Sequence, residues 1–299
     1  MDPAAGADFK RSHLTKIALL TLSFAAFYVY KEYRSTKKAK SLLVVKKDSS
    51  TIITASFPTE EIKMPKKKKK TIYLTFDDGP NKGTKNVLDI INNEQIPVTL
   101  FVIGEHVYGS KLQASVYDSV RSSAYIELAN HSFTHAHNKF SKFYSAPADV
   151  VNDFRRCADS LSLSSNIVRT PGRNIWRLND IKQTDNHLSK EAADALEKSG
   201  YIVMGWDLEW HFDDKLRAIQ SSDQLASQID SMFLNGRTKT LDHLVLLAHD
   251  QVYSNAKDSS SLRQLVGKLK EKGDYDFAFI NSYPGIEKLP LTDSGLLKK

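Results

Sequence analysis

The feature that most constrains the fold is a regular alternation of two kinds of segment from residue 71 onward. Short runs rich in β-branched or aromatic residues alternate with longer stretches of amphipathic, helical pattern. The runs predict seven strands, at residues 71–76, 98–103, 125–128, 167–169, 201–206, 244–248 and 277–280. Six helices are predicted between them, at residues 82–92, 111–122, 148–163, 189–199, 223–234 and 261–272. This alternation predicts a parallel α/β sheet covered by helices, either closed into a barrel or open.

The positive charge of the chain is concentrated in one segment. The whole chain has 42 Lys and Arg against 35 Asp and Glu, a formal net charge of +7. Residues 31–70 have a balance of +9, whereas residues 71–299 have a balance of −3. Because a domain that grips phosphate backbones carries the opposite balance, nucleic acid is not an expected partner.

The N-terminal segment, residues 1–30, has the plan of a signal peptide or signal anchor. Lys10, Arg11 and Lys16 precede an uncharged run at residues 17–30. That length suits a secretory hydrophobic segment and falls short of the roughly 20 residues that cross a bilayer comfortably. The run ends in aromatic residues instead of a small-residue cleavage site, which favours an uncleaved anchor. Residues 31–70 follow as a basic flexible tether that ends in five consecutive lysines.

Acidic and histidine residues gather just past the ends of the predicted strands, where parallel α/β folds build their active sites. Asp77 and Asp78 follow the first strand, and adjacent carboxylates cost energy unless a cation or a shared proton relieves them. His131 and His135 follow the third strand, and histidines four residues apart on a helical turn can converge on one metal. Since Cys157 is the only cysteine, a cysteine-built zinc cluster is excluded. One carboxylate and two imidazoles form a ligand set that leaves positions open for water and substrate.

Three more polar clusters follow later strands. Arg169 follows the fourth strand, and beside a carboxylate in a cleft an arginine holds that carboxylate ionised. Asp207 and Glu209 follow the fifth strand, and His249 follows the sixth. A histidine titrates near neutral pH, which suits donation of a proton to a leaving group. Polar clusters at five strand ends predict one common site.

In this order, the clusters resemble the motifs of the polysaccharide deacetylases of the NodB-homology type, carbohydrate esterase family 4. Residues 75–80 (Thr-Phe-Asp-Asp-Gly-Pro) look like the first motif of the family, and this string is highly specific. Residues 131–135 (His-Ser-Phe-Thr-His) look like the second motif, and residues 247–250 (Leu-Ala-His-Asp) look like the last. The resemblance spans residues 71–282. It implies an α/β fold, a distorted (β/α)7-type barrel, as a single catalytic domain within residues 71–299.

The resemblance also implies a base and a metal site. Asp77 is then the general base, and Arg169 is the partner that keeps it charged. Asp78, His131 and His135 are then the ligands of a divalent metal. Zinc is the expected ion, with cobalt, nickel and manganese as alternatives that suit this ligand set nearly equally.

By the same resemblance, His249 is the general acid. The fourth motif departs from the family pattern, since Asp207-Leu208-Glu209-Trp210 is one residue shorter than usual and has Glu in place of Asp. The acid that tunes His249 is therefore Asp207 or Glu209. Asp207 is included among the expected catalytic residues.

The resemblance further implies that Gly172, Trp210 and Leu247 contact the substrate. Gly172 stands where the family commonly has an aromatic residue, although its backbone N–H can still serve an oxyanion. In the family this aromatic residue would form a groove wall that contacts neighbouring sugars, and here such a wall could come only from another residue, for which Trp176 is the candidate. Trp210 either lines the pocket for the acetyl methyl group or is a core tryptophan.

These features predict a metal-dependent N-deacetylase of acetylated amino-sugar polymers, peptidoglycan or chitin-like chains. Because such polymers lie outside the cytoplasm, the domain is expected in the periplasm or at the cell surface, anchored in the membrane or secreted. The excess of Lys and Arg after the hydrophobic run favours the opposite orientation. Two alternatives stay open: a non-catalytic carbohydrate-binding relative, and an O-deacetylase or small-amide hydrolase with the same metal centre.

Overall fold

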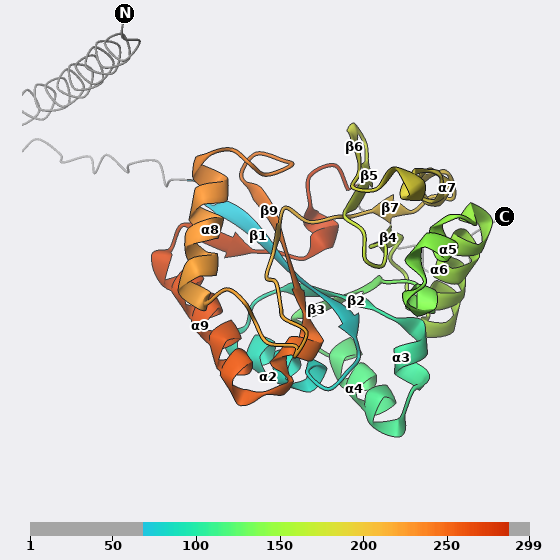
Figure 1. The fold of residues 1–299 in the computed structure, drawn as a ribbon. Coiled ribbons are helices and arrows are strands. Elements are labelled where there is room, and N and C mark those ends of the chain that lie inside the picture. Colours follow the sequence, from blue (N-terminus) through green and yellow to red (C-terminus); the bar gives the residue numbers. More distant parts are fainter. Residues whose placement is uncertain (1–67, 287–299) are drawn as a thin grey trace, which may run out of the picture. The chain divides into compact units, whose positions relative to one another are not determined.

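A ten-stranded sheet forms the centre of the domain (Figure 1). The computed structural model describes residues 68–286. The strands are β1 (Lys70–Gly79), β2 (Val98–Val102), β3 (Ile126–Asn130), β4 (Ile167–Val168), β5 (Ile175–Leu178), β6 (Ile181–Thr184), β7 (Ile202–Val203), β8 (Leu208–Glu209), β9 (His243–His249) and β10 (Tyr275–Phe277). They run in the order β6-β5-β7-β4-β3-β2-β1-β9-β8, and β10 pairs with the start of β1. Among the strands of residues 68–286, only the pairs that involve β5 are antiparallel.

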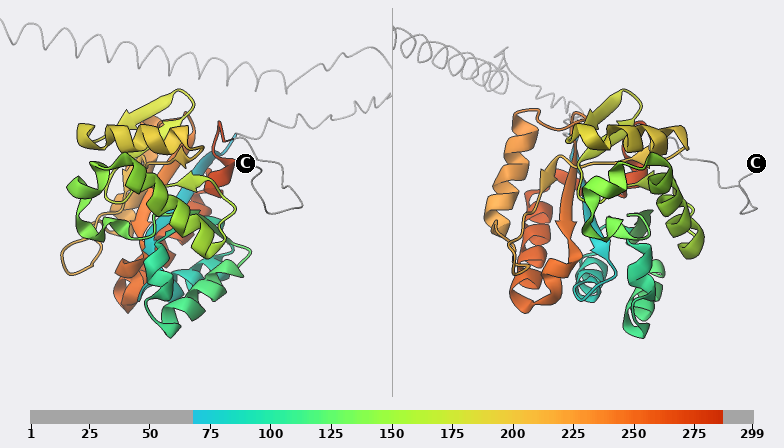
Figure 2. Two further views of the ribbon diagram at one scale, coloured as in Figure 1. Left: turned by 90° about the vertical axis from the view of Figure 1, so that its right-hand side faces the viewer. Right: turned by 45° about the vertical axis from the view of Figure 1, so that its right-hand side comes forward.

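Helices surround this sheet (Figure 2). The α-helices are α2 (Thr84–Glu94), α3 (Gly104–Tyr108), α4 (Lys111–Arg121), α5 (Phe140–Tyr144), α6 (Pro147–Leu161), α7 (Lys190–Lys198), α8 (Ser222–Leu234) and α9 (Ala256–Lys272). Within residues 68–286, the two ends of the sheet, β6 and β8, do not pair with each other. The sheet is therefore a partly open barrel.

The two faces of β1 bury different parts of the core. Ile72, Leu74 and Phe76 belong to a large apolar cluster that includes residues of α2, α8 and α9. Tyr73 belongs to a second cluster inside the barrel, with residues of β2, β3 and β9. Because side chains alternate along a strand, Asp77 follows Tyr73 on the inner face. The strand thus delivers a carboxylate to the inside of the barrel at its carboxyl end.

The structure confirms the α/β class and the barrel-like sheet. The six predicted helices are present, and each predicted strand overlaps an observed one, although the last, predicted at 277–280, overlaps β10 only at Phe277. The prediction missed β5, β6 and β8, which have two to four residues each, and the short helices α3 and α5. It also began α9 five residues late. The actual start, after Asn255, has a polar first turn, and the Asn255 side chain accepts a hydrogen bond from the backbone N–H of Asp258.

The predicted hydrophobic anchor and most of the predicted tether lie outside the described residues. None of the helices within residues 68–286 combines the length and the apolar character that spanning a bilayer requires.

Candidate active site

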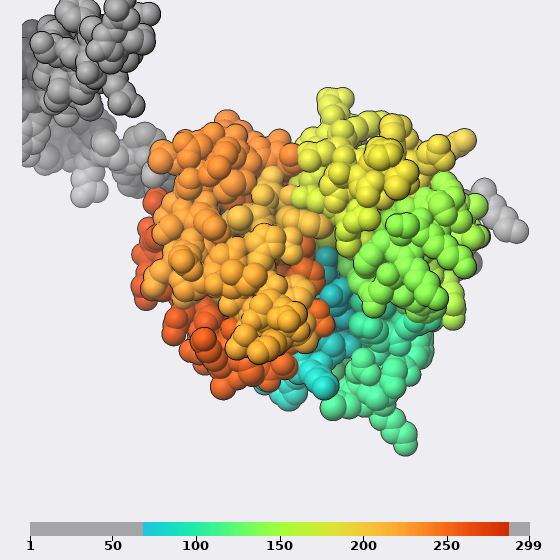
Figure 3. Space-filling view, in the orientation of Figure 1, coloured from blue at the N-terminus to red at the C-terminus, as the bar shows by residue number. Residues whose placement is uncertain are grey.

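A cavity of about 210 Å³ opens at the carboxyl ends of the parallel strands. Figure 3 shows a hollow between the orange C-terminal segments and the green and yellow central segments, with blue residues of the β1 segment at its bottom. The residues that line the cavity come from several strand ends: Asp77, Asp78, His131, His135, Thr170, Gly172, Trp206, Glu209, Leu247 and His249. The cavity therefore gathers residues from four of the predicted polar clusters, together with Thr170 and Gly172 from the strand end that carries Arg169.

Asp78, His131 and His135 form one compact cluster in this cavity. Asp78 Oδ1 lies 3.5 Å from His131 Nε2 and 3.2 Å from His135 Nε2. One ligand atom from each residue lies within 4.8 Å of the other two. Donor atoms held about 2.1 Å from one ion stand about 3.0 to 3.4 Å apart in octahedral or tetrahedral geometry. The spacing and the donor set thus fit a divalent metal ion.

The hydrogen bond of His131 leaves the other nitrogen of its ring facing the cluster. His131 Nδ1 lies 2.9 Å from the backbone carbonyl oxygen of Arg169. Because a carbonyl can only accept, Nδ1 carries the proton, and a neutral ring presents the Nε2 lone pair to the cluster. Burial lowers the pKa of His131, but the carboxylates of Asp77 and Asp78 outweigh burial and raise it.

The charge of Asp78 is complementary to the two histidines. Burial alone would raise the pKa of the Asp78 carboxyl, but hydrogen bonds and positive charge from His131 and His135 hold that pKa well below its usual range. A positive charge between Asp78 and the two histidines is therefore favourable, whether protons or a divalent ion carry it.

The loop that carries the two histidines is not the helical turn that their spacing predicts. Ser132 and His135 have positive φ angles of 69° and 49°. The Asp153 carboxylate on α6 accepts hydrogen bonds from the backbone N–H groups of Phe133 (3.0 Å) and Thr134 (3.1 Å). The Ser132 hydroxyl accepts another from the backbone N–H of His135, at 3.0 Å. These hydrogen bonds, and not a helical repeat, bring the imidazoles together.

Asp250 holds the loop after β1 in place. Its buried carboxylate accepts hydrogen bonds from the Thr84 hydroxyl and the Asn81 amide. Burial raises the pKa of Asp250 to about 7. The loop approaches Asp250 so closely that a Cβ atom on Gly83 would lie 1.8 Å from the Asp250 carbonyl oxygen. Only glycine fits there. Asp250 belongs to the last motif of the sequence, but this supporting role was not predicted.

Asp77 forms a buried ion pair with Arg169. Arg169 Nη1 donates to Asp77 Oδ1 at 2.9 Å and to the Thr75 hydroxyl at 2.8 Å. Its Nε and Nη2 donate to the carbonyl oxygens of Met204 (3.1 Å) and Gly205 (3.0 Å). Burial lowers the pKa of Arg169, and the Asp77 charge opposes that effect. The second oxygen of Asp77, Oδ2, lies 3.6 Å from His131 Nε2 and so faces the cluster of Asp78 and the two histidines.

Strand pairing places His249 beside Asp77. β1 and β9 are parallel, and Asp77 is directly opposite His249 in their register. Residues opposite each other on neighbouring strands project to the same face of the sheet. Two side chains 172 positions apart in the sequence thus flank the same cavity.

Asp207 is not brought to the cavity. Its carboxylate oxygens accept hydrogen bonds from the backbone N–H groups of Lys239 (2.7 Å) and Val245 (2.8 Å), and Val245 lies in the middle of β9. Burial raises the pKa of Asp207 to about 6. Glu209, two residues further along, lines the cavity. Of the two acids that the sequence left open, Asp207 therefore supports the barrel, and Glu209 faces the site.

Of the predicted substrate contacts, some line the cavity and others are buried in the core. Gly172 and Leu247 line the cavity. Trp210 is buried in the outer core, where its indole N–H donates to the Gln220 carbonyl at 2.9 Å, so the core alternative holds for this residue. Trp176 is also fully buried and forms no groove wall. Trp206, which is not among the predicted contacts, lines the cavity instead.

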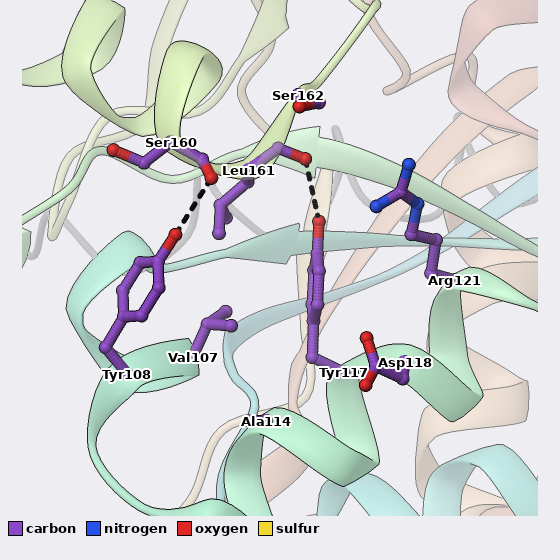
Figure 4. A pocket seen from close by; sticks show the side chains of 9 residues that line it. All are labelled: Val107, Tyr108, Ala114, Tyr117, Asp118, Arg121, Ser160, Leu161 and Ser162. Atoms are coloured by element: carbon purple, nitrogen blue, oxygen red, sulfur yellow. Dashed lines mark hydrogen bonds between the residues drawn. The ribbon is translucent and has the colours of Figure 1, made fainter.

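A second cavity, of about 250 Å³, lies between α3, α4 and the end of α6 (Figure 4). The hydroxyls of Tyr108 and Tyr117 donate to the carbonyl oxygens of Ser160 and Leu161 on α6. Its only acidic lining residue is Asp118. This cavity is the larger of the two, but it has no histidine–carboxylate cluster, so the chemistry is assigned to the cavity at the strand ends.

Comparison with known proteins points to one family. A sequence profile described as "Polysaccharide deacetylase" matches residues 64–174. The chain is 25% identical over 285 residues to a peptidoglycan-N-acetylglucosamine deacetylase of Bacillus cereus, a match that covers 90% of this chain and 92% of that protein. It is 27% identical over 207 residues to a bifunctional xylanase/xylan deacetylase of Cellvibrio japonicus, covering 68% of this chain and 26% of that protein. The crystal structure of a polysaccharide deacetylase from Bacillus cereus is similar with a TM-score of 0.50 and 26% identity, over 71% of this chain and 93% of that one.

Proposed function

Because this chain belongs to the polysaccharide deacetylase family, we propose that it hydrolyses the N-acetyl amide of an acetylated amino-sugar polymer, either peptidoglycan or a chitin-like chain. The observation that carries the proposal is the meeting of three groups in one cavity: the buried Asp77–Arg169 pair, a carboxylate with two imidazoles, and His249. These groups supply a base, a cation site and an acid, which are the parts that amide hydrolysis by water requires.

Asp78, His131 and His135 would hold the metal, and we propose zinc as the ion. When bound, such an ion supplies Lewis-acid chemistry to the attacking water and to the acetyl carbonyl. The ligand set is small, and so it leaves room for both water and substrate.

Asp77 accepts the proton of the attacking water. Arg169 donates a hydrogen bond to Oδ1 at 2.9 Å and so orients the carboxylate. Oδ2 is the oxygen that faces the cluster and is therefore the proton acceptor. Gly172 lines the cavity, and its backbone N–H would donate to the oxyanion that forms on the acetyl group.

His249 donates a proton to the amide nitrogen as the carbon–nitrogen bond breaks. Because it pairs with Asp77 across β1 and β9, acid and base flank the scissile bond from neighbouring strands. Acetate and the free amine of the sugar are the products. Trp206 and Leu247 line the same cavity and present apolar surface that displaces water from the reacting groups.

The location of the enzyme follows from its substrate. We place the domain outside the cytoplasm, anchored by residues 1–30 and separated from the membrane by the basic tether. An insoluble polymer cannot diffuse to the enzyme, and a flexible tether lets the domain reach many positions on it.

An ester substrate is the alternative, favoured by the similarity to a protein named as a xylan deacetylase. The same water, base and cation site can attack an acetyl ester, whose alkoxide leaves with less need of an acid.

The test is acetate release by the full-length chain from N-acetylglucosamine oligomers, peptidoglycan and acetylated xylan, measured before and after chelation and after zinc is restored. Release from an amino sugar that chelation abolishes and zinc restores supports the proposal. Release from xylan alone supports the ester alternative. Binding to a polymer without any release supports a non-catalytic relative and contradicts the proposal.

A further inference from the structure

The imidazole of His249 is held in an unusual way for an acid catalyst. Its Nδ1 is buried and has no hydrogen-bond partner within residues 68–286. Neither Asp207 nor Glu209 reaches it: the carboxylate of Glu209 lies 3.5 Å from His211 Nδ1 instead. A hydrogen bond to the second ring nitrogen is the usual means of orienting such a histidine. Something else must orient this ring.

The phenyl ring of Phe212 packs against His249. The ring centroids are 4.8 Å apart and the planes are inclined by 65°, an edge-to-face arrangement. Such pairs have a preferred geometry and stabilise it beyond the burial of area. Because Nδ1 is the buried nitrogen, this packing leaves Nε2 as the nitrogen that faces the cavity.

Phe212 is presented by a hairpin, residues 211–220, between β8 and α8. The base of the hairpin is closed by the side chain of Gln220. Its amide donates to the Glu209 carbonyl at 3.1 Å and accepts from the His211 backbone N–H at 2.9 Å. Its backbone carbonyl accepts the indole N–H of Trp210 at 2.9 Å. The hairpin is thus tied directly to the strand that borders the site.

A separate set of hydrogen bonds stabilises the tip of the hairpin. Asp213 accepts hydrogen bonds from the backbone N–H groups of Lys215 (2.9 Å) and Arg217 (3.0 Å), and its carboxylate pairs with the Arg217 guanidinium at 2.7 Å. Phe212 and Ala218 form an antiparallel bridge between the two arms. A hairpin held at both ends loses little entropy when it holds a neighbouring ring in place.

We propose that Phe212 is a positioning residue that orients the His249 imidazole for proton transfer to the amide nitrogen. The proposal rests on the proposed function, since it assigns a task to the acid of that reaction. An edge-to-face aromatic contact biases an equilibrium between orientations by about 2- to 10-fold. Loss of the ring removes that bias from the step in which His249 acts and leaves the polymer-binding groups unchanged.

The kinetic test compares two replacements of Phe212 in the full-length chain, with N-acetylglucosamine oligomers as substrate. Phe212→Ala is expected to lower kcat about 5- to 10-fold with KM within twofold, whereas Phe212→Tyr, which retains the ring, keeps kcat within about twofold. Ile219→Ala is the control, because Ile219 is 62% exposed on the same hairpin. An unchanged kcat in Phe212→Ala overturns the proposal, and so does an equal loss in Phe212→Tyr.

A spectroscopic test needs no turnover. In protein labelled with ¹³C at the histidine rings, the His249 signal is identified by its loss in His249→Asn. Phe212→Ala is expected to shift this signal, because the ring current of Phe212 is removed, while Ile219→Ala leaves it in place. A His249 signal that does not move in Phe212→Ala overturns the proposal. If the wild-type chain releases no acetate, the proposed function fails, and this measurement still decides whether the Phe212 ring lies against His249, which the positioning role requires.

Discussion

Replacement of Arg169 by methionine is expected to destabilise the protein far more than the loss of an ordinary ion pair. Arg169 is fully buried, and its partner Asp77 is 3% exposed. Methionine fills much of the same volume but donates no hydrogen bonds. The Asp77 carboxylate and the carbonyl oxygens of Met204 and Gly205 would all lose their donor.

The size of the effect follows from the buried charge. Removal of one partner of a buried ion pair costs about 3–5 kcal/mol, because the other charge is left uncompensated. A second substitution, Asp77→Asn, removes that charge. The double variant should therefore be more stable than Arg169→Met alone by about 2 kcal/mol or more.

Urea unfolding of metal-free protein, followed by circular dichroism, measures both effects. A chelator is included because a bound cation near Asp77 would offset the lost guanidinium. Lys85→Met is the matched control, since Lys85 pairs with Asp89 on the exposed surface and such pairs contribute less than about 1 kcal/mol. A loss of less than about 1 kcal/mol in Arg169→Met would refute the reasoning, as would a double variant no more stable than the single one.

Three further predictions concern the metal, the pH dependence and the first loop. His131→Ala and His135→Ala should each lose zinc, measured by atomic absorption after dialysis; retained stoichiometric zinc would show that the ligands are other residues. Burial raises the pKa of Asp207 to about 6 from an ordinary 3.8, so the native state binds the extra proton and the free energy of unfolding falls as pH rises through this window. The fall is at most about 3 kcal/mol, and Asp207→Asn should remove it; parallel stability curves between about pH 4 and pH 6 would contradict the burial argument. Gly83→Ala should lower stability by about 1–3 kcal/mol, because the new Cβ meets the Asp250 carbonyl. Gly267→Ala, with nothing within 4 Å, is its control, and equal stability of the two variants would argue against the close approach.

The sequence could predict the cavity because parallel strands bring their carboxyl ends to one edge. Asp77 and His249 lie far apart in the chain, yet each follows a recognisable apolar run, and β1 and β9 pair them directly. The pairing of Arg169 with Asp77 was implied by the family resemblance, and the physical reason for it is that a buried carboxylate needs a nearby cation.

The sequence could not predict how far each residue lies from the cavity along its strand. Asp207 and Glu209 are two residues apart, so the alternation of side chains along a strand places both on the same face. This alternation therefore cannot predict which of the two reaches the cavity. The register of β8 on β9 does so: Glu209 is opposite Leu247 at the cavity, whereas Asp207 lies two residues deeper, where backbone N–H groups bind it. β8 has only two residues, too few for a periodic pattern.

The tryptophans illustrate a second limit. Trp206, Trp210 and Trp176 all stand near the predicted motifs, and residue type does not reveal which face of the sheet each one joins. Trp210 lies in the outer core and Trp176 in the inner core, while Trp206 lines the cavity. The hairpin of β5 and β6, which carries Trp176, was itself missed because buried Arg177 interrupts its apolar pattern.

Acetate release from peptidoglycan by wild type and Asp77→Asn, with the zinc content of both proteins, tests the central claim most directly. Wild type should release acetate, and Asp77→Asn should release none while it retains one equivalent of zinc, because the metal ligands are untouched and only the proton acceptor is lost. Near wild-type release by Asp77→Asn would contradict the assigned chemistry.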